Sequence, residues 1–212
     1  MNRRFSSFLT AAAVVLVPVT ALNAQPAASA VAAPAAASND TAAGEFIADL
    51  SQRAFAVLRE TGAKDAARSR FKVMLRENFA VDETGNRLIR RYRSQITPAQ
   101  LAAYQAALPE YVVNLYSERL YDYSKATVKI VRTAPHGALT DVYSRVETPG
   151  RRPVDVIWAV ERRAGRPLIA NVTVSGVNLA LTQEADFSSY IAKNGFDALV
   201  AFLKSSNARP VA

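Results

Sequence analysis

Cysteine is absent from this chain of 212 residues, and histidine occurs only once, at His136. The lack of cysteine excludes disulfides, thiolate metal sites and cysteine nucleophiles. His136 lies between proline and glycine, a pattern that predicts an exposed turn rather than a catalytic position. The sequence has no serine in a nucleophile-elbow pattern, no glycine-rich loop after a strand and no metal-ligand spacing. It therefore predicts no catalytic residues, no cofactor and no metal, and we expect a protein that is not an enzyme.

Carboxylates offer the remaining route to acid–base chemistry. Asp122, between Tyr121 and Tyr123, is the one polar group placed beside apolar residues, and we favour its interpretation as a helix end paired with an arginine. Asp155 lies in a predicted strand and is expected to point away from the apolar face. A small-molecule enzyme of the cone-shaped α+β type, with Asp122 or Asp155 as base, stays an alternative. It requires a buried carboxylate that faces a cavity.

The first 24 residues have the pattern of a secretory signal peptide. Arg3 and Arg4 precede an apolar run over residues 8–19, which is too short to span a bilayer comfortably. Small residues place the cleavage site between positions 24 and 30. No cysteine follows the run, which excludes a lipoprotein anchor. We favour a signal peptide over a membrane anchor and expect export to the periplasm of a bacterium.

The remainder of the chain predicts one domain with flanking segments. Residues 25–43 are rich in alanine, proline and serine and predict a disordered leader. Order is expected to begin near Gly44, with the domain over 44–205 and a flexible tail over 206–212. A chain of 212 residues is long enough for one sizeable hydrophobic core.

Positive charge exceeds negative charge, with 26 Lys and Arg against 18 Asp and Glu and a formal net charge of +8. Loss of Arg3 and Arg4 with the predicted signal leaves +6. Export argues against nucleic acid as a partner, and no basic run with interleaved aromatic residues is present. Attraction to an anionic surface and simple solubility both stay open as explanations of the charge.

The first half of the domain has a helical apolar period. Apolar residues recur at three and four positions and predict a helix ending at Gly62, a second over about 66–79 and a short third opened by Asp82. No internal repeat is visible, and no heptad pattern is long enough for a coiled coil.

A fourth helix is predicted to begin in the segment "ITPAQ". Thr97 is suited to cap the helix, and Pro98 fits its first position. Pro109 lies inside the apolar pattern that follows, so we expect a kink or a break near Leu108.

From about Lys125 the apolar period changes to two. Four strands separated by His-Gly, Pro-Gly and Ala-Gly turn signals predict an antiparallel meander with an apolar even-numbered face. Gly176 permits a sharp turn from the last strand into two amphipathic helices. We predict an α+β fold: a helical N-terminal half, a four-stranded antiparallel twisted sheet and two C-terminal helices that cover one sheet face around an apolar pocket.

The ending of the domain contains a specific pattern. The segments "TPAQLAAYQAALPEYVVNLYSERLYDY", "VDVIWAVER" and "NVTVSGVNL" make residues 44–203 resemble the MlaC family, also called Ttg2-type or toluene-tolerance proteins. The positions that match the family ending are Val172, Gly176, Val177, Leu179, Phe187, Asn194, Gly195 and Leu199. Asn171 stands where the family usually has Asp, Asn178 where it has Ser, and Glu184 where it has Arg. In addition, no tryptophan opens the last strand.

The resemblance implies a periplasmic lipid-binding protein that serves phospholipid transport. Such a protein carries a phospholipid between an outer-membrane lipoprotein–porin complex and an inner-membrane ABC transporter complex with an MlaD-like subunit, and so maintains outer-membrane lipid asymmetry. In this reading the protein is the substrate-binding component of the ABC transporter. The residues expected to line the lipid pocket are Phe71, Leu75, Tyr104, Leu108, Val112, Ile130, Val142, Val156, Trp158, Val172 and Val174.

Two further alternatives stay open at this point. The cargo of a carrier can be a hopanoid or another apolar lipid, and a periplasmic adaptor that binds proteins would have no ligand. A carrier requires a long, dry cavity, whereas an adaptor requires a filled core and an exposed apolar patch. Four arginines, Arg87, Arg90, Arg91 and Arg93, form either a docking surface or a solvated face, and we favour the solvated face.

Overall fold

The protein is represented by a computed structural model that describes residues 33–59, 64–121 and 123–208. The predicted signal peptide, the predicted helix end at Gly62 and the candidate base Asp122 lie outside these residues.

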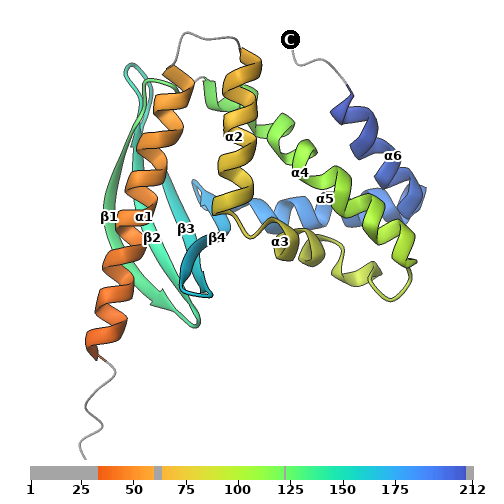
Figure 1. The fold of residues 1–212 in the computed structure, drawn as a ribbon, viewed down its shortest axis with the longest axis horizontal. Helices are drawn as coiled ribbons and strands as arrows, with labels where there is room; N and C mark the ends of the chain where they lie inside the picture. The colour runs from red at the N-terminus through yellow and green to blue at the C-terminus, as the bar shows by residue number, and fades with distance from the viewer. Residues whose placement is uncertain (1–32, 60–63, 122, 209–212) are drawn as a thin grey trace, which may run out of the picture. The chain divides into compact units, whose positions relative to one another are not determined.

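The described chain consists of a helical first half, a sheet and two final helices, which confirms the predicted class (Figure 1). The first half contains α1 (Ala33–Arg59), α2 (Lys64–Asn78), α3 (Val81–Leu88), the short 3₁₀-helix η1 (Arg90–Tyr92) and α4 (Pro98–Tyr121). The sheet contains β1 (Thr127–His136), β2 (Leu139–Glu147), β3 (Val154–Arg163), β4 (Arg166–Val174) and β5 (Val177–Asn178). The chain closes with α5 (Leu179–Asn194) and α6 (Phe196–Asn207).

Helix α1 begins at Ala33, earlier than the order expected from Gly44 onward. Alanine is the best helix former, so an alanine-rich segment continues a helix once packing holds its far end. That packing exists, because Ala43 is buried and the Thr140 hydroxyl donates a 3.0 Å hydrogen bond to Asp40. Composition alone does not reveal such contacts.

Helix α4 begins as predicted but does not break. Thr97 Oγ1 accepts a 3.2 Å hydrogen bond from Gln100 N, while Thr97 N donates to the Gln100 side chain at 2.9 Å. These reciprocal bonds form a capping box before Pro98. The helix then continues through Pro109 to Tyr121, so of the kink or break expected near Leu108 the break does not occur. Proline inside a helix costs about 3 kcal/mol, and the packing of α4 against both α2 and α6 offsets that cost.

The sheet is an antiparallel meander in the order β1-β2-β3-β4-β5. The predicted strands are all present, and β5 is an additional short strand. Val142 lies opposite Trp158, which lies opposite Val172 in the next strand. Because paired residues point to the same side of a sheet, these three define an apolar face, called the inner face below.

Two β-bulges interrupt the alternation of side chains. One lies at Val131 in β1, and the other lies at Ala170 in β4, opposite the step from Ala159 to Val160 in β3. The second bulge pairs Val160 with Ile169, and both side chains are buried. We expected Ile169 to face outward, and that expectation is wrong because the bulge shifts the period by one residue.

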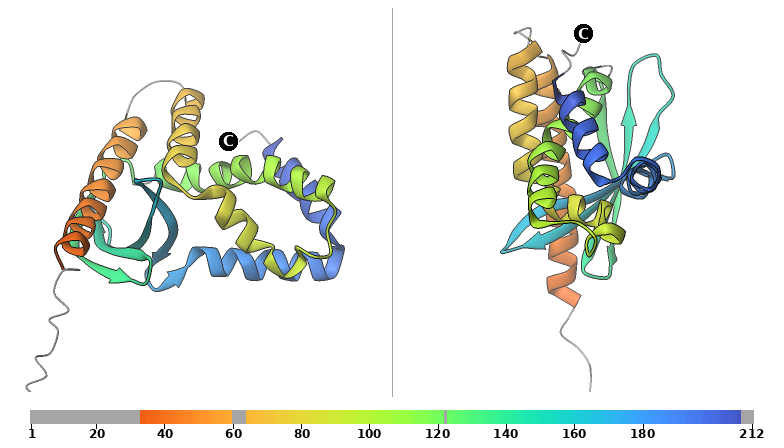
Figure 2. Two further views of the ribbon diagram at one scale, coloured as in Figure 1. Left: turned by 60° about the horizontal axis from the view of Figure 1, so that its bottom comes forward. Right: turned by 90° about the vertical axis from the view of Figure 1, so that its right-hand side faces the viewer.

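Helix α1, rather than the C-terminal pair, is the main cover of the sheet. It contacts β1 and β2, whereas α2 contacts β4 (Figure 2). Helix α5 contacts β4 and β5, and α6 packs chiefly against α4. We expected α5 and α6 to cover the inner face. Their apolar residues instead meet the apolar stripe of α4, so they form a core of their own with it.

The hydrophobic residues accordingly form two groups. The helical cluster lies among α3, α4, α5 and α6 and contains Leu88, Ile89, Tyr104, Ala107, Leu108, Phe187, Ile191, Phe196, Leu199, Val200 and Leu203. The sheet cluster lies on the inner face and contains Ala43, Ile47, Leu50, Ala126, Val142, Val146, Val156, Val160 and Ile169.

Candidate functional site

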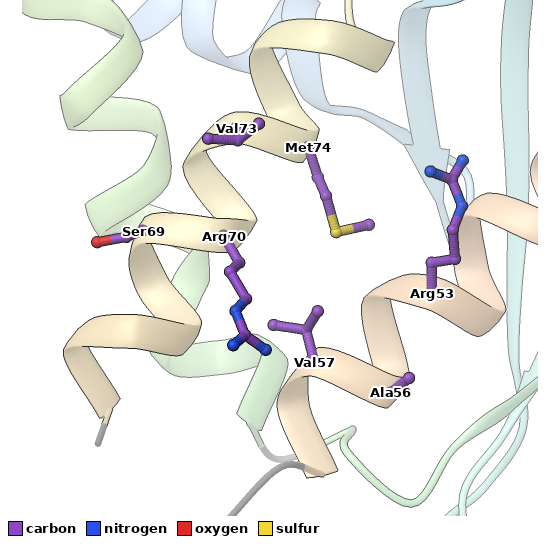
Figure 3. A pocket seen from close by; sticks show the side chains of 7 residues that line it. All are labelled: Arg53, Ala56, Val57, Ser69, Arg70, Val73 and Met74. Atoms are coloured by element: carbon purple, nitrogen blue, oxygen red, sulfur yellow. The ribbon is translucent and has the colours of Figure 1, made fainter. Parts of the chain in front are cut away.

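An apolar cleft of about 580 Å³ lies between α1 and α2 (Figure 3). Its apolar walls are Ala56 and Val57 of α1 and Val73 and Met74 of α2. In Figure 3 the Met74 side chain extends into the space between the two helices. Methionine adapts its shape readily, so this wall accommodates ligands of irregular outline.

Met74 connects the cleft to the hydrophobic residues on the inner face of the sheet. Met74 lines the cleft and also packs against the sheet cluster. Trp158 of β3 and Val172 of β4 are half-buried and contact both parts of that cluster. Helix α1 covers β1 and β2, so these half-buried side chains lie on the part of the inner face that α1 covers least.

A polar pair holds the tryptophan in place. Trp158 Nε1 donates a 2.9 Å hydrogen bond to Ser144 Oγ, which donates in turn to the carbonyl of Val156 at 3.2 Å. Ser144 is the one buried hydroxyl of this sheet face in the described chain, and it is satisfied. The indole therefore presents its apolar ring to the site without leaving its own N–H unpaired.

Two arginines and a serine supply the polar part of the cleft. Arg53 Nε lies 2.9 Å from Asp49 Oδ2 on the same helix. Arg70 extends from α2 toward Val57, and Ser69 lies beside it on the same helix (Figure 3). No acidic side chain lines the cleft among the described residues. The site thus combines apolar walls with cationic groups, which suits an amphiphile better than a polar substrate.

Helix α2 is held against α4 by charge. Lys72 and Glu110 form an ion pair with both side chains about one-third exposed. An ion pair of this exposure contributes about 1 kcal/mol or less. It links α2, which forms one wall of the cleft, to α4.

The residues predicted to line a pocket divide between the two clusters. The sheet residues are found together on the inner face: Ile130, Val142, Val156, Trp158, Val172 and Val174. Tyr104 and Leu108 are buried in the helical cluster, and Val112 packs against it. These three therefore pack with residues of α3, α5 and α6, and their contact with lipid stays a prediction. On α2, Leu75 is buried and Phe71 half-buried.

Sequence reasoning missed the cleft between α1 and α2. Val57 and Met74 belong to the apolar stripes of the first two predicted helices, and the pattern does not single out Arg53, Arg70 or Val73. One residue could have indicated the cleft. Val73 is an aliphatic residue outside the apolar stripe of its helix, and in the structure it is 52% exposed. An exposed valine in an amphipathic helix is compatible with a site, but alone it does not identify one.

Asp155, the candidate base within the described residues, lacks the environment that acid–base chemistry needs. Asp155 is exposed and lies 2.8 Å from Arg145, whose hydrogen bond lowers the pKa of the Asp155 carboxyl. Its outward direction confirms the sequence prediction. His136 is exposed and its Nδ1 lies 3.1 Å from Asp141. No group of three or more potential metal ligands occurs among the residues described.

Fold and site together define an α+β protein with an apolar, arginine-flanked ligand cleft. Comparison with known families places residues 48–205 in the MlaC protein family, and the chain therefore belongs to that family. A solved structure of a phospholipid-binding protein from Ralstonia solanacearum, in complex with a phospholipid, is similar to this chain. The TM-score is 0.69 at 21% identity, and the match covers 78% of this chain and 97% of the other.

The positions where the sequence departs from the family ending have distinct local roles. Asn178 Oδ1 accepts a 3.0 Å hydrogen bond from Leu181 N, so asparagine caps α5 as a serine would. Glu184 lies 3.6 Å from Arg90, which balances its charge. The Asn171 side-chain oxygen is buried and has no hydrogen-bond partner.

None of the described helices is both long and apolar enough to span a bilayer.

Proposed function

We propose that this protein is a periplasmic carrier that binds the acyl chains of a phospholipid. The observation that supports this most directly is the apolar cleft between α1 and α2, whose Met74 also packs against the sheet cluster. Membership of the MlaC family and the similarity to a phospholipid-binding protein support the same proposal.

Transfer energetics explain why a carrier needs such a site. Two acyl chains contain about 30 methylenes, and each costs about 0.8 kcal/mol in water, so about 25 kcal/mol opposes free diffusion. An apolar cleft removes most of this cost, because bilayer and protein interior are similar solvents for a hydrocarbon chain. Net transfer then lies near zero and needs no chemical step.

The apolar walls of the site favour occupancy by lipid. The cleft of about 580 Å³ is open at the surface, so its apolar side chains contact water when no ligand is bound. Each methylene that an acyl chain buries there contributes about 0.8 kcal/mol, and we therefore expect the purified protein to contain lipid.

The wider role we propose is that of a shuttle. The protein exchanges lipid with an inner-membrane ABC transporter complex, with an MlaD-like subunit, and with an outer-membrane lipoprotein–porin complex, and it thereby maintains outer-membrane lipid asymmetry. A hopanoid or another rigid apolar lipid is the alternative cargo.

The decisive experiment is mass spectrometry of organic extracts. The full chain is expressed with its own N-terminal segment and purified without detergent. Near-stoichiometric phospholipid in the extract supports the proposal and identifies the headgroup class. A hopanoid in the extract supports a carrier function with a different cargo. A folded protein that contains no lipid, and acquires none from vesicles, contradicts the proposal and favours a protein-binding adaptor.

A further inference from the structure

Two exposed aliphatic residues lie together where the sheet passes into α5. Val177 and Leu181 are 52% and 61% exposed. They flank Asn178, which caps α5, so both belong to the same short segment. The other large exposed hydrophobic residues of the described chain are Val73, which lines the cleft, and Val131 on β1. Neither Val177 nor Leu181 lines the cleft.

A run of arginines lies beside this segment. Arg90 Nη2 is 3.6 Å from Glu184 Oε1, and Glu184 follows Leu181 by three residues on the same face of α5. Arg91 and Arg93 are exposed and form no ion pair with any described residue. Arg90 thus lies beside the first turns of α5, and the unpaired guanidinium groups of Arg91 and Arg93 follow it in the chain.

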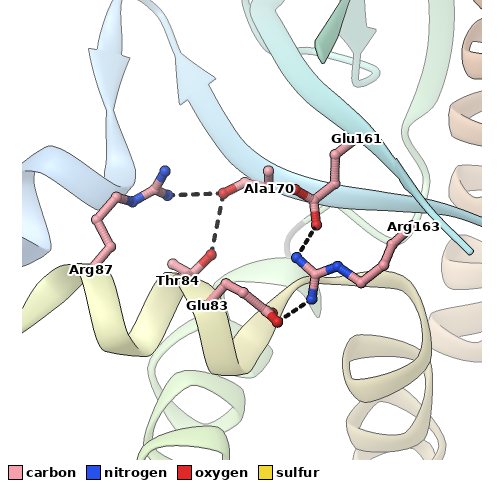
Figure 4. A network of polar contacts seen from close by, with 6 residues as sticks. All are labelled: Glu83, Thr84, Arg87, Glu161, Arg163 and Ala170. Atoms are coloured by element: carbon pink, nitrogen blue, oxygen red, sulfur yellow. Dashed lines mark hydrogen bonds and ion pairs between the residues drawn. The ribbon is translucent and has the colours of Figure 1, made fainter. Parts of the chain in front are cut away.

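Polar contacts fix the arginine run in position. Thr84 and Arg87 of α3 both donate to the carbonyl of Ala170 on β4, at 3.2 and 3.0 Å (Figure 4). The Arg163 guanidinium joins Glu83 of α3 to the β3–β4 hairpin in the same network. These contacts hold α3, and the arginines that follow it, against the sheet.

A further contact fixes the run against α5. The Tyr92 hydroxyl donates a 3.0 Å hydrogen bond to the carbonyl of Ser188. The backbone that carries the arginines is therefore held against α5, and little backbone entropy is lost when their side chains bind a partner.

We propose that Val177, Leu181, Arg90, Arg91 and Arg93, called the docking surface below, contact an anionic lipid bilayer. The proposal rests on the proposed function in taking the protein to be a lipid carrier, and it adds direct contact with a bilayer to the exchange with protein complexes. Guanidinium groups bind phosphate with paired hydrogen bonds. Aliphatic side chains between them enter the apolar boundary below the headgroups.

Charge and composition favour a bilayer over a protein. Residues 87–93 contain four arginines, and residues 177–188 contain Glu184 and Asp186, which leaves a net charge of +2. Protein interfaces concentrate their binding energy in aromatic anchors, and the exposed large hydrophobic residues of the described chain are all aliphatic.

Vesicle flotation tests the proposal. The full chain is mixed at low ionic strength with vesicles of phosphatidylglycerol and phosphatidylcholine in equal parts, or of phosphatidylcholine alone. Each arginine near an anionic bilayer raises binding about fivefold, so replacing Arg90, Arg91 and Arg93 by Gln is expected to weaken binding about 100-fold. Leu181→Asp is expected to weaken it about tenfold or more.

Matched variants separate the surface from net charge. Replacing Arg152, Arg162 and Arg166 by Gln removes the same charge from exposed positions elsewhere, and Val131→Asp places an acid at another exposed valine. These controls are expected to bind anionic vesicles within about threefold of wild type, because only their long-range charge has changed. Circular dichroism verifies that each variant is folded.

Three results would overturn the proposal. They are wild-type protein that does not float with anionic vesicles, equal losses in both triple variants, and a Leu181→Asp variant that binds as tightly as wild type. The lipid content of the same preparations is measured in parallel. Lipid-loaded protein that ignores vesicles contradicts the docking surface and leaves the carrier intact, whereas vesicle binding by protein without lipid supports the surface and contradicts the carrier.

Discussion

Tyr104 combines deep burial with one polar contact. The residue is fully buried in the helical cluster, and its hydroxyl donates a 3.0 Å hydrogen bond to the carbonyl of Gly85. The phenol ring lies edge-on to Phe187 with the ring centroids 6.3 Å apart. Burial raises the pKa of the Tyr104 hydroxyl far above its ordinary value, because a phenolate would lose its hydration there. The residue therefore stays neutral wherever the protein is folded.

This environment predicts a loss of stability in alkali. Tyrosine in the unfolded chain ionises near pH 10, whereas folded Tyr104 does not, so its contribution is complete below pH 10 and declines above it. The decline is about 1.4 kcal/mol per pH unit. Tyr104→Phe removes this pH-dependent contribution and one hydrogen bond. Loss of the hydrogen bond is expected to lower the free energy of unfolding by about 1 kcal/mol at pH 8. Urea unfolding at pH 8 and pH 11 is expected to show the variant losing less stability than wild type.

Tyr143→Phe serves as the control for this prediction, because Tyr143 is half-buried on the sheet. Equal losses between pH 8 and pH 11 in wild type and Tyr104→Phe would contradict the assignment of the alkaline effect to Tyr104.

At the scale of elements, the hairpin between β4 and β5 directs the chain into α5. Ser175 and Gly176 have φ of +49° and +83°, and Val174 pairs with Val177 across them. Two positive φ values in a two-residue loop match the twist of the flanking strands. The sharp turn predicted at Gly176 is confirmed. The two residues after it, Val177 and Asn178, pair with β4 and form β5.

Gly176→Val tests the conformation of this turn. A Cβ atom at Gly176 meets no other atom within 4 Å, so the cost comes from the backbone alone. A left-handed conformation costs an L-residue about 1–2 kcal/mol, and chemical denaturation is expected to show a loss of that size. Ser175→Gly is the companion change. It relieves the same strain but increases the freedom of the unfolded chain, so its stability should lie within about 0.5 kcal/mol of wild type. A Gly176→Val protein as stable as wild type would show that the turn adopts another conformation.

At the scale of the whole molecule, the helical cluster and the sheet cluster differ in how completely side chains fill them. The helical cluster is filled by side chains such as Leu199 and Leu203, neither of which is exposed. The sheet cluster retains half-buried residues around Trp158 and Val172 and adjoins the cleft. We therefore expect the helical cluster to contribute mainly stability, and the sheet cluster to contribute mainly ligand binding.

Leu199→Ala probes the helical cluster. Truncation of a buried leucine costs about 2–5 kcal/mol, so the midpoint of thermal unfolding is expected to fall substantially. The folded variant should nevertheless purify with as much lipid as wild type. Loss of lipid from a folded Leu199→Ala protein would show that the two clusters are not separate in function.

Val172→Trp probes the sheet cluster in the opposite sense. The added ring occupies the inner face where acyl chains are expected to lie, so lipid content measured by mass spectrometry should fall severalfold while the protein stays folded. Val156→Trp at a buried position of the same face should also block loading, with an added cost of about 1–3 kcal/mol from crowding. Unchanged lipid content in both variants would contradict the assignment of this face.

The sequence by itself determined the elements of this protein. The cap at Thr97, the meander with its turn signals and the sharp turn at Gly176 are all encoded by a few neighbouring residues, because propensity, capping and turn geometry act locally. The period-two pattern correctly predicted the apolar inner face, except in β4 beyond the bulge at Ala170. The ending pattern also identified the family.

Only the tertiary structure decided how these elements pack. An apolar stripe does not specify which element will cover it. Helix α4 was expected to face the sheet, yet Tyr104 and Leu108 pack with α5 and α6. The early start of α1, the unbroken α4 and the cleft beside Met74 likewise depend on partners far away in the chain. The physical reason is that hydrophobic attraction is non-directional. Periodicity reveals which face of an element is buried, and only the assembled chain determines what buries it.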